Sequence, residues 1–254
     1  MSNPLFIVEN LDAGYKTRHG STVVVRGVDA TLHKGEVVAL IGRNGAGKST
    51  LLRTFAAFQP PLGGRVMIAG CDVAKMQAAD VAKSISIVLS NSETAPLTVQ
   101  EVVSLGRTPY INFLGKLAVK DKKAVEMAME MMGITRFANR MLATLSDGER
   151  QKCMIAKALA QETPLMLLDE PTAFLDYPSK VSLFKLLKQL AVTTGKAVLV
   201  STHDIELSFA LTDRVWFVDG GVMHKGTAEE LLDTDAVKSF VDCGDVHYNM
   251  TKQK

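Results

Sequence analysis

The sequence is poor in cysteine, in net charge and in long apolar runs, and each scarcity excludes a class of protein. Its three cysteines, Cys71, Cys153 and Cys243, have the spacing of neither a disulfide framework nor a metal site. A formal net charge of +2 provides no basic footprint, so we expect no nucleic-acid partner. The longest apolar runs, such as 37–41 and 197–200, are far shorter than the roughly 18 to 20 residues that a membrane-spanning helix requires.

What remains is the composition of a globular protein with a substantial core, with 47% hydrophobic and 22% charged residues. The first residues, MSNPLFIVEN, have neither the basic start nor the apolar stretch of a secretory signal. Together with the scattered thiols, this favours a cytoplasmic protein.

Short apolar runs rich in β-branched residues alternate along the chain with helical patterns. Runs such as EVVALIG and PLMLLDEP are typical of strands buried on both faces of a parallel sheet. We expect strands over 36–42, 65–70, 84–90, 164–171, 196–204 and 213–221. Apolar residues three and four apart predict one helix over 121–133 and another between Pro178 and Gly195. The stretch 91–160 contains no convincing strand, which indicates a helical insert in an α/β chain.

The segment GRNGAGKST, residues 42–50, matches the phosphate-binding pattern G-x-x-x-x-G-K-[ST]. Glycines let such a loop turn its backbone N–H groups inward, and the helix that follows adds the positive end of its dipole. Lys48 would bring its charge to the β- and γ-phosphates, and Ser49 would bind Mg²⁺. The alternative is a glycine-rich turn capped by Ser49. We expect ATP to contact Gly42, Arg43, Asn44, Gly45, Ala46, Gly47, Lys48, Ser49 and Thr50.

Two carboxylates follow the apolar run of LMLLDEP. Because ligands of parallel α/β sheets bind beyond the carboxyl ends of the strands, we expect Asp169 to face the phosphate loop and hold Mg²⁺ through a water. Glu170 would point the other way along the pleat and orient the attacking water. The alternative is a pair of solvated carboxylates that cap the next helix.

His203 ends the next apolar run, in STHD. We expect it to lie near the γ-phosphate and donate a hydrogen bond there; the alternative is a structural histidine. The predicted catalytic residues are therefore Glu170, His203 and Lys48.

Five segments appear in one order along the chain: GRNGAGKST, LSDGERQ (145–151), LLDEP (167–171), TAFLD (172–176) and STHD. They make the chain resemble the ATP-binding subunit of ABC transporters over about residues 4–242. The resemblance implies an α/β fold: a P-loop NTPase core with a mostly parallel sheet, an N-terminal antiparallel β part and an inserted helical subdomain. Tyr15, in LDAGY, would stack on the adenine.

The same resemblance implies a single domain over 1–254. Its parts would be a nucleotide-binding core of 1–90 and 161–243, a helical subdomain of 91–160 and a tail of 244–254.

LSDGERQ lies far along the chain from the phosphate loop. In ABC ATPases two subunits pack head to tail, so the resemblance implies that this segment contacts ATP held by a second copy of the chain. The residues involved would be Ser146, Asp147, Gly148 and Glu149. Asp176 would lie at the same interface between the two subunits, the dimer seam. Ser146 and Glu149 also match the capping box S-x-x-E, and we expect capping in the open dimer and phosphate contact in the closed one.

Three positions depart from the family's pattern. The family usually has a Mg²⁺-binding Gln after the strand expected over 84–90, whereas this chain has Ser90 followed by Asn91. Asp147 replaces a glycine of the family's signature segment, which is LSDGERQ here, so its carboxylate has to point aside to avoid repelling ATP. Glu149 replaces the usual glutamine and adds another negative charge.

The segment TVQEVVSLGRTPY, residues 98–110, resembles the ATPases of iron–siderophore, haem and vitamin B12 importers. This implies an ATPase that uses ATP and Mg²⁺, lies peripherally on the cytoplasmic face of the inner membrane, and docks permease subunits through its helical subdomain. Two alternatives stay open. One is a soluble ABC ATPase acting on a protein assembly, such as that for iron–sulfur clusters. The other is a nucleotide-binding regulatory module that hydrolyses little.

Overall fold

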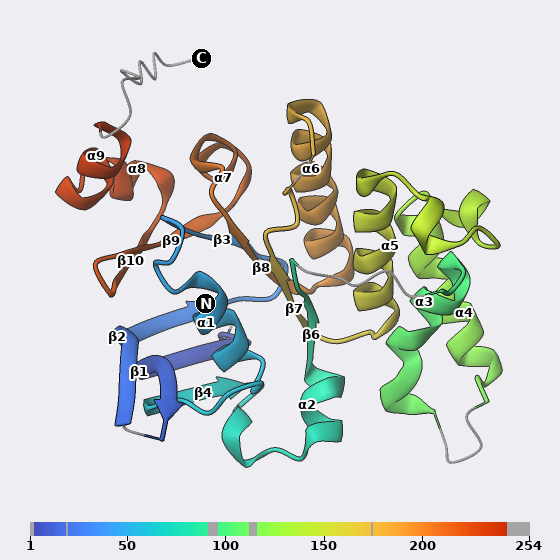
Figure 1. Cartoon of the computed structure of the whole chain (residues 1–254), viewed down its shortest axis with the longest axis horizontal. Helices are drawn as coiled ribbons and strands as arrows, with labels where there is room; N and C mark the ends of the chain where they lie inside the picture. Colours follow the sequence, from blue (N-terminus) through green and yellow to red (C-terminus); the bar gives the residue numbers. More distant parts are fainter. Residues whose placement is uncertain (1–2, 19, 91–95, 112–115, 174, 243–254) are drawn as a thin grey trace.

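A computed structural model describes residues 3–18, 20–90, 96–111, 116–173 and 175–242 (Figure 1). Its strands form two sheets, and the first is antiparallel, with four strands in the order β2-β1-β4-β5. This sheet is the predicted N-terminal antiparallel part. Its strands are β1 (Phe6–Thr17), β2 (Gly20–Leu32), β4 (Gly63–Ile68) and β5 (Cys71–Asp72).

The second sheet has six strands in the order β10-β9-β3-β8-β7-β6. All its pairs are parallel except the antiparallel pair β10–β9. Strands β3, β7 and β8 are buried along their whole length, which explains their unbroken apolar sequences. The strands are β3 (Val37–Gly42), β6 (Ile85–Val88), β7 (Leu165–Asp169), β8 (Ala197–Thr202), β9 (Arg214–Asp219) and β10 (Val222–Gly226).

Helices cover both faces of the parallel sheet. Val38 and Leu40 of β3 belong to the same apolar cluster as α1, whereas Ala39 and Ile41 belong to the cluster of α7. Figure 1 accordingly shows α6 and α7 on one face, and α1 with the antiparallel sheet on the other. The helices of the core are α1 (Lys48–Phe55), α2 (Ala78–Ser84), α6 (Tyr177–Thr194), α7 (Ile205–Leu211), α8 (Ala228–Leu232) and α9 (Asp235–Asp242).

The predicted helical insert forms a separate group of helices beside the sheet (Figure 1). Between 96 and 111 and between 116 and 160 the structure describes helices and turns, with one isolated bridge between Thr98 and Met141 and no strand. The elements are α3 (Val99–Ser104), η2 (Leu105–Tyr110), α4 (Val119–Met131), η3 (Thr135–Phe137), η4 (Leu142–Thr144) and α5 (Asp147–Ala160), with η1 (Val73–Lys75) in the core.

Arg107 joins these helices to the core. Its buried guanidinium lies 2.9 Å from Asp121 of α4 and 2.6 Å from Glu162, and it donates to the carbonyl of Ala160. A buried charge of this kind is stabilised only when such partners surround it.

Most predicted elements lie where the apolar pattern placed them, with small shifts at their ends. The strand expected over 84–90 is shorter, because Ser84 is the last residue of α2. Strand β10 was not predicted, and its exposed and half-buried residues explain why it lacks an apolar run. The predicted tail, 244–254, lies outside the described residues. Within the described part of the chain, no helix combines the length and apolarity needed to cross a bilayer.

Candidate nucleotide-binding site

The loop 42–47 leads from β3 into α1 and accepts only glycine at two positions. A Cβ on Gly42 would lie 2.4 Å from the carbonyl oxygen of Val218, and one on Gly47 would lie 2.7 Å from a methyl of Val25. Gly47 is also the N-cap of α1, with φ 106°, and no side chain caps this helix. The first N–H groups of α1 therefore face the loop without a side-chain acceptor, as an anion-binding helix end requires.

Lys48 connects this loop to the carboxylate at the end of β7. Its side chain is 7% exposed, and its ammonium donates to the carbonyls of Gly42 at 2.8 Å and Arg43 at 3.3 Å and lies 3.6 Å from Glu170 Oε1. The predicted phosphate-binding lysine and the predicted catalytic carboxylate are thus neighbours.

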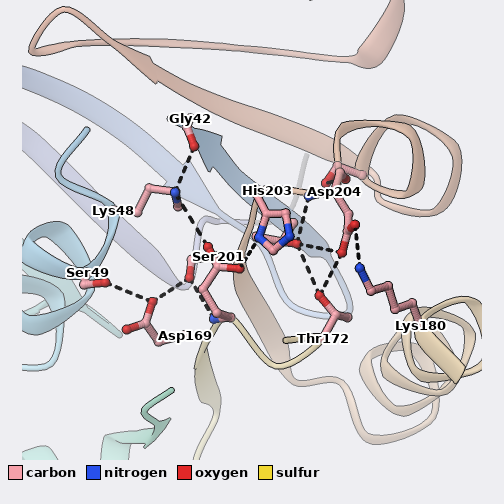
Figure 2. Close-up of polar contacts among 12 residues, drawn as sticks. Gly42, Lys48, Ser49, Asp169, Thr172, Lys180, Ser201, His203 and Asp204 are labelled. Atoms are coloured by element: carbon pink, nitrogen blue, oxygen red, sulfur yellow. Dashed lines mark hydrogen bonds and ion pairs between the residues drawn. The ribbon is translucent and has the colours of Figure 1, made fainter. Parts of the chain in front are cut away.

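Asp169 shares one carboxylate oxygen between two hydroxyl groups (Figure 2). Ser49 Oγ donates to Asp169 Oδ1 at 3.2 Å, and Ser201 Oγ donates to the same oxygen at 2.6 Å. A hydroxyl and a carboxylate are ligands that fit Mg²⁺, which uses few protein ligands and completes its shell with water and phosphate. Among the described residues, no group of three or more His, Cys, Asp or Glu side chains forms a metal site. By its ligand chemistry, the Ser49–Asp169 pair is the candidate for Mg²⁺.

Ser201 is a site residue that the sequence reasoning missed. It lies on β8 directly opposite Asp169, and its carbonyl and hydroxyl both accept the N–H of Glu170, at 3.1 and 3.0 Å. A hydroxyl at the end of a wholly buried strand is the signal that could have identified it.

Glu170 and His203 contact each other directly. His203 Nδ1 lies 3.0 Å from Glu170 Oε2. Glu170 has a φ of 50° and lies one residue beyond β7, so a local left-handed turn separates its side chain from that of Asp169. The predicted alternation along the strand pleat is thus not the cause of their different directions, because the strand has already ended.

Asp204 is the centre of a second cluster of polar side chains, which lies on the other side of His203 from Lys48 and Asp169 (Figure 2). It accepts hydrogen bonds from Thr172 at 3.0 Å, from Lys180 at 2.9 Å and from Thr202 at 3.3 Å. Burial by itself would raise the pKa of Asp204, but the bonds from Lys180 and Thr172 outweigh burial and lower this pKa below its usual value.

Tyr15 lies beside the phosphate loop, although it belongs to the antiparallel sheet. Its hydroxyl is 2.5 Å from Thr50 Oγ1, while 47% of the residue stays exposed. Gln59 holds this strand to α1, because its amide donates to the carbonyl of Gly14 and to Thr54 Oγ1.

Ser90 lies at the same edge of the sheet as Asp169. It follows β6 by two residues, and β6 pairs in parallel with β7, with Val88 opposite Leu168. Asn91 lies outside the described residues.

The predicted signature residues stay within their own helix in the single chain. Ser146 and Glu149 form the predicted capping box: Ser146 N–H donates to Glu149 Oε2 at 3.0 Å, and Glu149 N–H donates to Ser146 Oγ at 3.4 Å. Hydrogen bonds from the backbone and side chain of Ser146 lower the pKa of Glu149. Asp147 pairs with Arg150 at 3.4 Å, and Asp176 caps α6 by accepting from Ser179 N–H at 3.1 Å.

Comparisons with known proteins identify the family. A model described as ABC transporter matches residues 25–173, more than half of the chain. The chain belongs to the ABC transporter family. The achromobactin transport ATP-binding protein CbrD of Dickeya dadantii is 38% identical over 230 residues, covering 89% of this chain and 85% of CbrD. The iron(3+)-hydroxamate import ATP-binding protein FhuC of Bacillus subtilis is 36% identical over 233 residues, covering 91% of this chain and 85% of FhuC.

A solved structure agrees with this assignment. The dimeric structure of MJ0796, a bacterial ABC transporter cassette, matches this cassette with a TM-score of 0.76 at 28% identity, covering 88% of this chain and 98% of MJ0796. The family resemblance and the fold class read from the sequence are therefore confirmed. The chain is an ATP-binding cassette and an ATPase of the ABC family.

Proposed function

We propose that this ABC ATPase is the ATP-hydrolysing subunit of an importer for an iron–siderophore, haem or cobalamin-type substrate. The observation that carries the proposal is the convergence of Lys48, Asp169, Glu170 and His203 at one edge of the parallel sheet. CbrD and FhuC, named for achromobactin and iron-hydroxamate, support the substrate class. Both names describe transport or import, which favours this reading over a soluble assembly factor or a non-hydrolysing regulator.

ATP would lie with its phosphates on residues 42–50 and its adenine on Tyr15. The uncapped end of α1 and the Lys48 ammonium supply the positive charge that a triphosphate needs. Ser49 would hold Mg²⁺ directly, Asp169 would hold it through a water, and Ser90 would reach it from the end of the next strand. Bound Mg²⁺ would neutralise charge on the phosphates.

Glu170 would orient the attacking water and accept its proton. Its contact with His203 supports a position of the histidine on the water side of the γ-phosphate, where it would donate a hydrogen bond to a phosphate oxygen. Lys48, 3.6 Å from Glu170, would stabilise the negative charge of the transferred phosphoryl group.

A second copy of the chain would complete the site in a homodimer. Ser146 and the N–H of Gly148 would contact the γ-phosphate across the seam, flanked by Asp147 and Glu149. Asp176 would lie at the same seam. A Cβ on Gly148 would meet Leu175 at 3.4 Å, so the signature helix and the loop before Asp176 already lie together in each copy.

The permease would dock where the helical subdomain (91–160) meets the core (1–90 and 161–243), with the whole cassette peripheral on the cytoplasmic face of the inner membrane. A cavity of about 900 Å³ opens between these parts. Apolar residues from both parts line it, among them Phe58, which is 62% exposed, and Leu105. An exposed apolar groove of this kind fits an apolar protein segment.

Two substitutions test the ATPase mechanism. Glu170→Gln should keep ATP binding and stop turnover, which leaves a stable ATP-bound dimer on a sizing column. Lys48→Ala should lose nucleotide binding. A monomeric Glu170→Gln protein in ATP, or unchanged ATP affinity in Lys48→Ala, would contradict the assignment. Purification from native membranes tests the importer role, which requires that a membrane-embedded partner accompany the ATPase.

A further inference from the structure

The carboxylate of Asp204 joins three segments that meet beside His203 (Figure 2). Thr172 comes from the seam loop, residues 172–176, and Thr202 ends β8. Lys180 comes from the first turns of α6. The N–H of Asp204 donates in turn to Thr202 Oγ1 at 3.1 Å, so the backbone that carries His203 is fixed on both sides of its side chain.

Lys180 is an unusual residue for its place in α6. It lies four residues after Asp176, which caps this helix, and the positive end of a helix dipole disfavours a cation there. Its side chain and that of Asp204 are each only 18% exposed. The Lys180 ammonium is therefore held by Asp204 rather than by solvent or by its own helix. The lowered pKa of Asp204 supports an ionised carboxylate in this contact.

We propose that Lys180, Asp204 and Thr172 are positioning residues that fix His203 against Glu170 and couple it to the dimer seam. None of the three touches Lys48, Ser49, Asp169 or Glu170 through a hydrogen bond among the described contacts. Asp204 follows His203 directly in the chain and Thr172 belongs to the seam loop, so their effect would pass through these two segments. A second copy that contacts Asp176 would act on the first turn of α6. Lys180 and Asp204 carry that displacement to His203. The inference rests on the proposed hydrolytic role of Glu170 and His203.

The same helix offers a matched control. Lys188 of α6 forms an ion pair with Asp213, and Asp213 also accepts the N–H of Val37 at the start of β3. This second pair thus lies at the opposite edge of the sheet from the nucleotide. Lys180→Met and Lys188→Met remove the same charge from the same helix, but only the first removes a bond to the segment of His203.

The steady-state ATPase rate of the full chain separates these variants. Loss of a hydrogen bond between charged groups should lower kcat of Lys180→Met about tenfold, with ATP affinity unchanged. The Hill coefficient for ATP should fall toward one, because contacts at the dimer seam would no longer affect the position of His203. Lys188→Met should keep the wild-type kcat and Hill coefficient, and Lys180→Arg should restore most of the lost activity. Equal kcat values for the two methionine variants would overturn the proposal.

Hydrogen exchange provides a readout that does not depend on turnover. The amides of 201–206 and 170–173 should exchange faster in Lys180→Met than in Lys188→Met. Unchanged exchange in Lys180→Met would overturn the positioning role. A wild-type protein that binds ATP but never hydrolyses it would instead refute the proposed function, and the exchange contrast would still decide whether Lys180 positions His203.

Discussion

Two helix N-termini in this cassette both carry the positive end of a helix dipole, but one is left uncapped and the other is capped by its own side chains. Helix α1 begins behind Gly47, without any side-chain cap, in the loop that is proposed to hold phosphate. Helix α5 begins behind Ser146, with a complete capping box and two acidic residues in its first turn. Both ends expose backbone N–H groups and a positive dipole, so both attract an anion.

The difference shows which site is complete within one chain. The end of α1 leaves its N–H groups to a ligand, and steric crowding excludes a side chain at Gly42 and Gly47. The end of α5 already binds its own carboxylate, that of Glu149. In the proposed dimer, a phosphate brought by a second copy would compete with this internal anion, so closure would need additional contacts across the seam.

Gly47→Ala should disrupt the phosphate loop before α1, and we expect it to have the largest effect of these variants. The new Cβ would collide with Val24 and Val25 at 2.8 and 2.7 Å, and φ 106° strains any L-residue. We expect ATP affinity to fall by at least about 100-fold, because strain and collision add to more than about 3 kcal/mol. Titration with a fluorescent ATP analogue measures this.

Gly45→Ala is the control for that experiment. Gly45 also has a positive φ, of 80°, but a Cβ there would meet no atom within 4 Å. Only the left-handed conformation is strained, at about 1 kcal/mol, so the loss should be about tenfold or less. Equal losses in the two variants would show that collision with β2 does not shape the loop.

Ser146→Ala tests the N-terminus of α5 and should have an intermediate effect. Loss of the cap costs about 1 kcal/mol of stability, and loss of the proposed γ-phosphate contact should lower kcat about tenfold or more. ATP binding to the single chain should not change. Thermal unfolding and ATPase assays measure the two effects.

Thr227→Ala provides the comparison, because Thr227 and Glu230 form the same capping box at α8. This variant should lose similar stability but keep the wild-type ATPase rate. If both alanine variants keep full activity, Ser146 is a helix cap and nothing more.

Glu149→Gln should have the smallest effect. It removes the negative charge of Glu149 and so tests the internal anion at the N-terminus of α5. The Ser146 bonds that lower the pKa of Glu149 favour its ionised form in the folded protein. The carboxylate therefore stabilises the fold above its usual pKa, and this contribution disappears as the pH falls through the lowered pKa. The stability gap between wild type and variant should thus be largest at neutral pH and vanish well below about pH 4. At neutral pH the variant should dimerise at a slightly lower ATP concentration.

Local patterns predicted those features of the site that depend on near neighbours in the chain. The G-x-x-x-x-G-K-S spacing placed Lys48 and Ser49 at the start of α1, and S-x-x-E placed the capping box at α5. Apolar runs located the buried strands, and with them Asp169 at a strand end.

Ser201, Asp204 and Lys180 escaped prediction for a physical reason. Their partners lie 24 to 32 residues away in sequence, and pairing of β7 with β8 brings Ser201 opposite Asp169. A hydroxyl at the end of a buried strand could have drawn attention to Ser201, but no local pattern pairs it with Asp169, and a lysine in a helix has no distinctive local pattern.

By itself, the sequence determined the family, the phosphate loop and the helix cap at Ser146, because dihedral preference, spacing and periodicity act between residues close along the chain. Only the tertiary structure decided that Ser201 holds Asp169, that Glu170 meets His203, and that Lys180 and Thr172 share Asp204. Those contacts depend on the register of parallel strands and the packing of α6, which form only when distant segments come together.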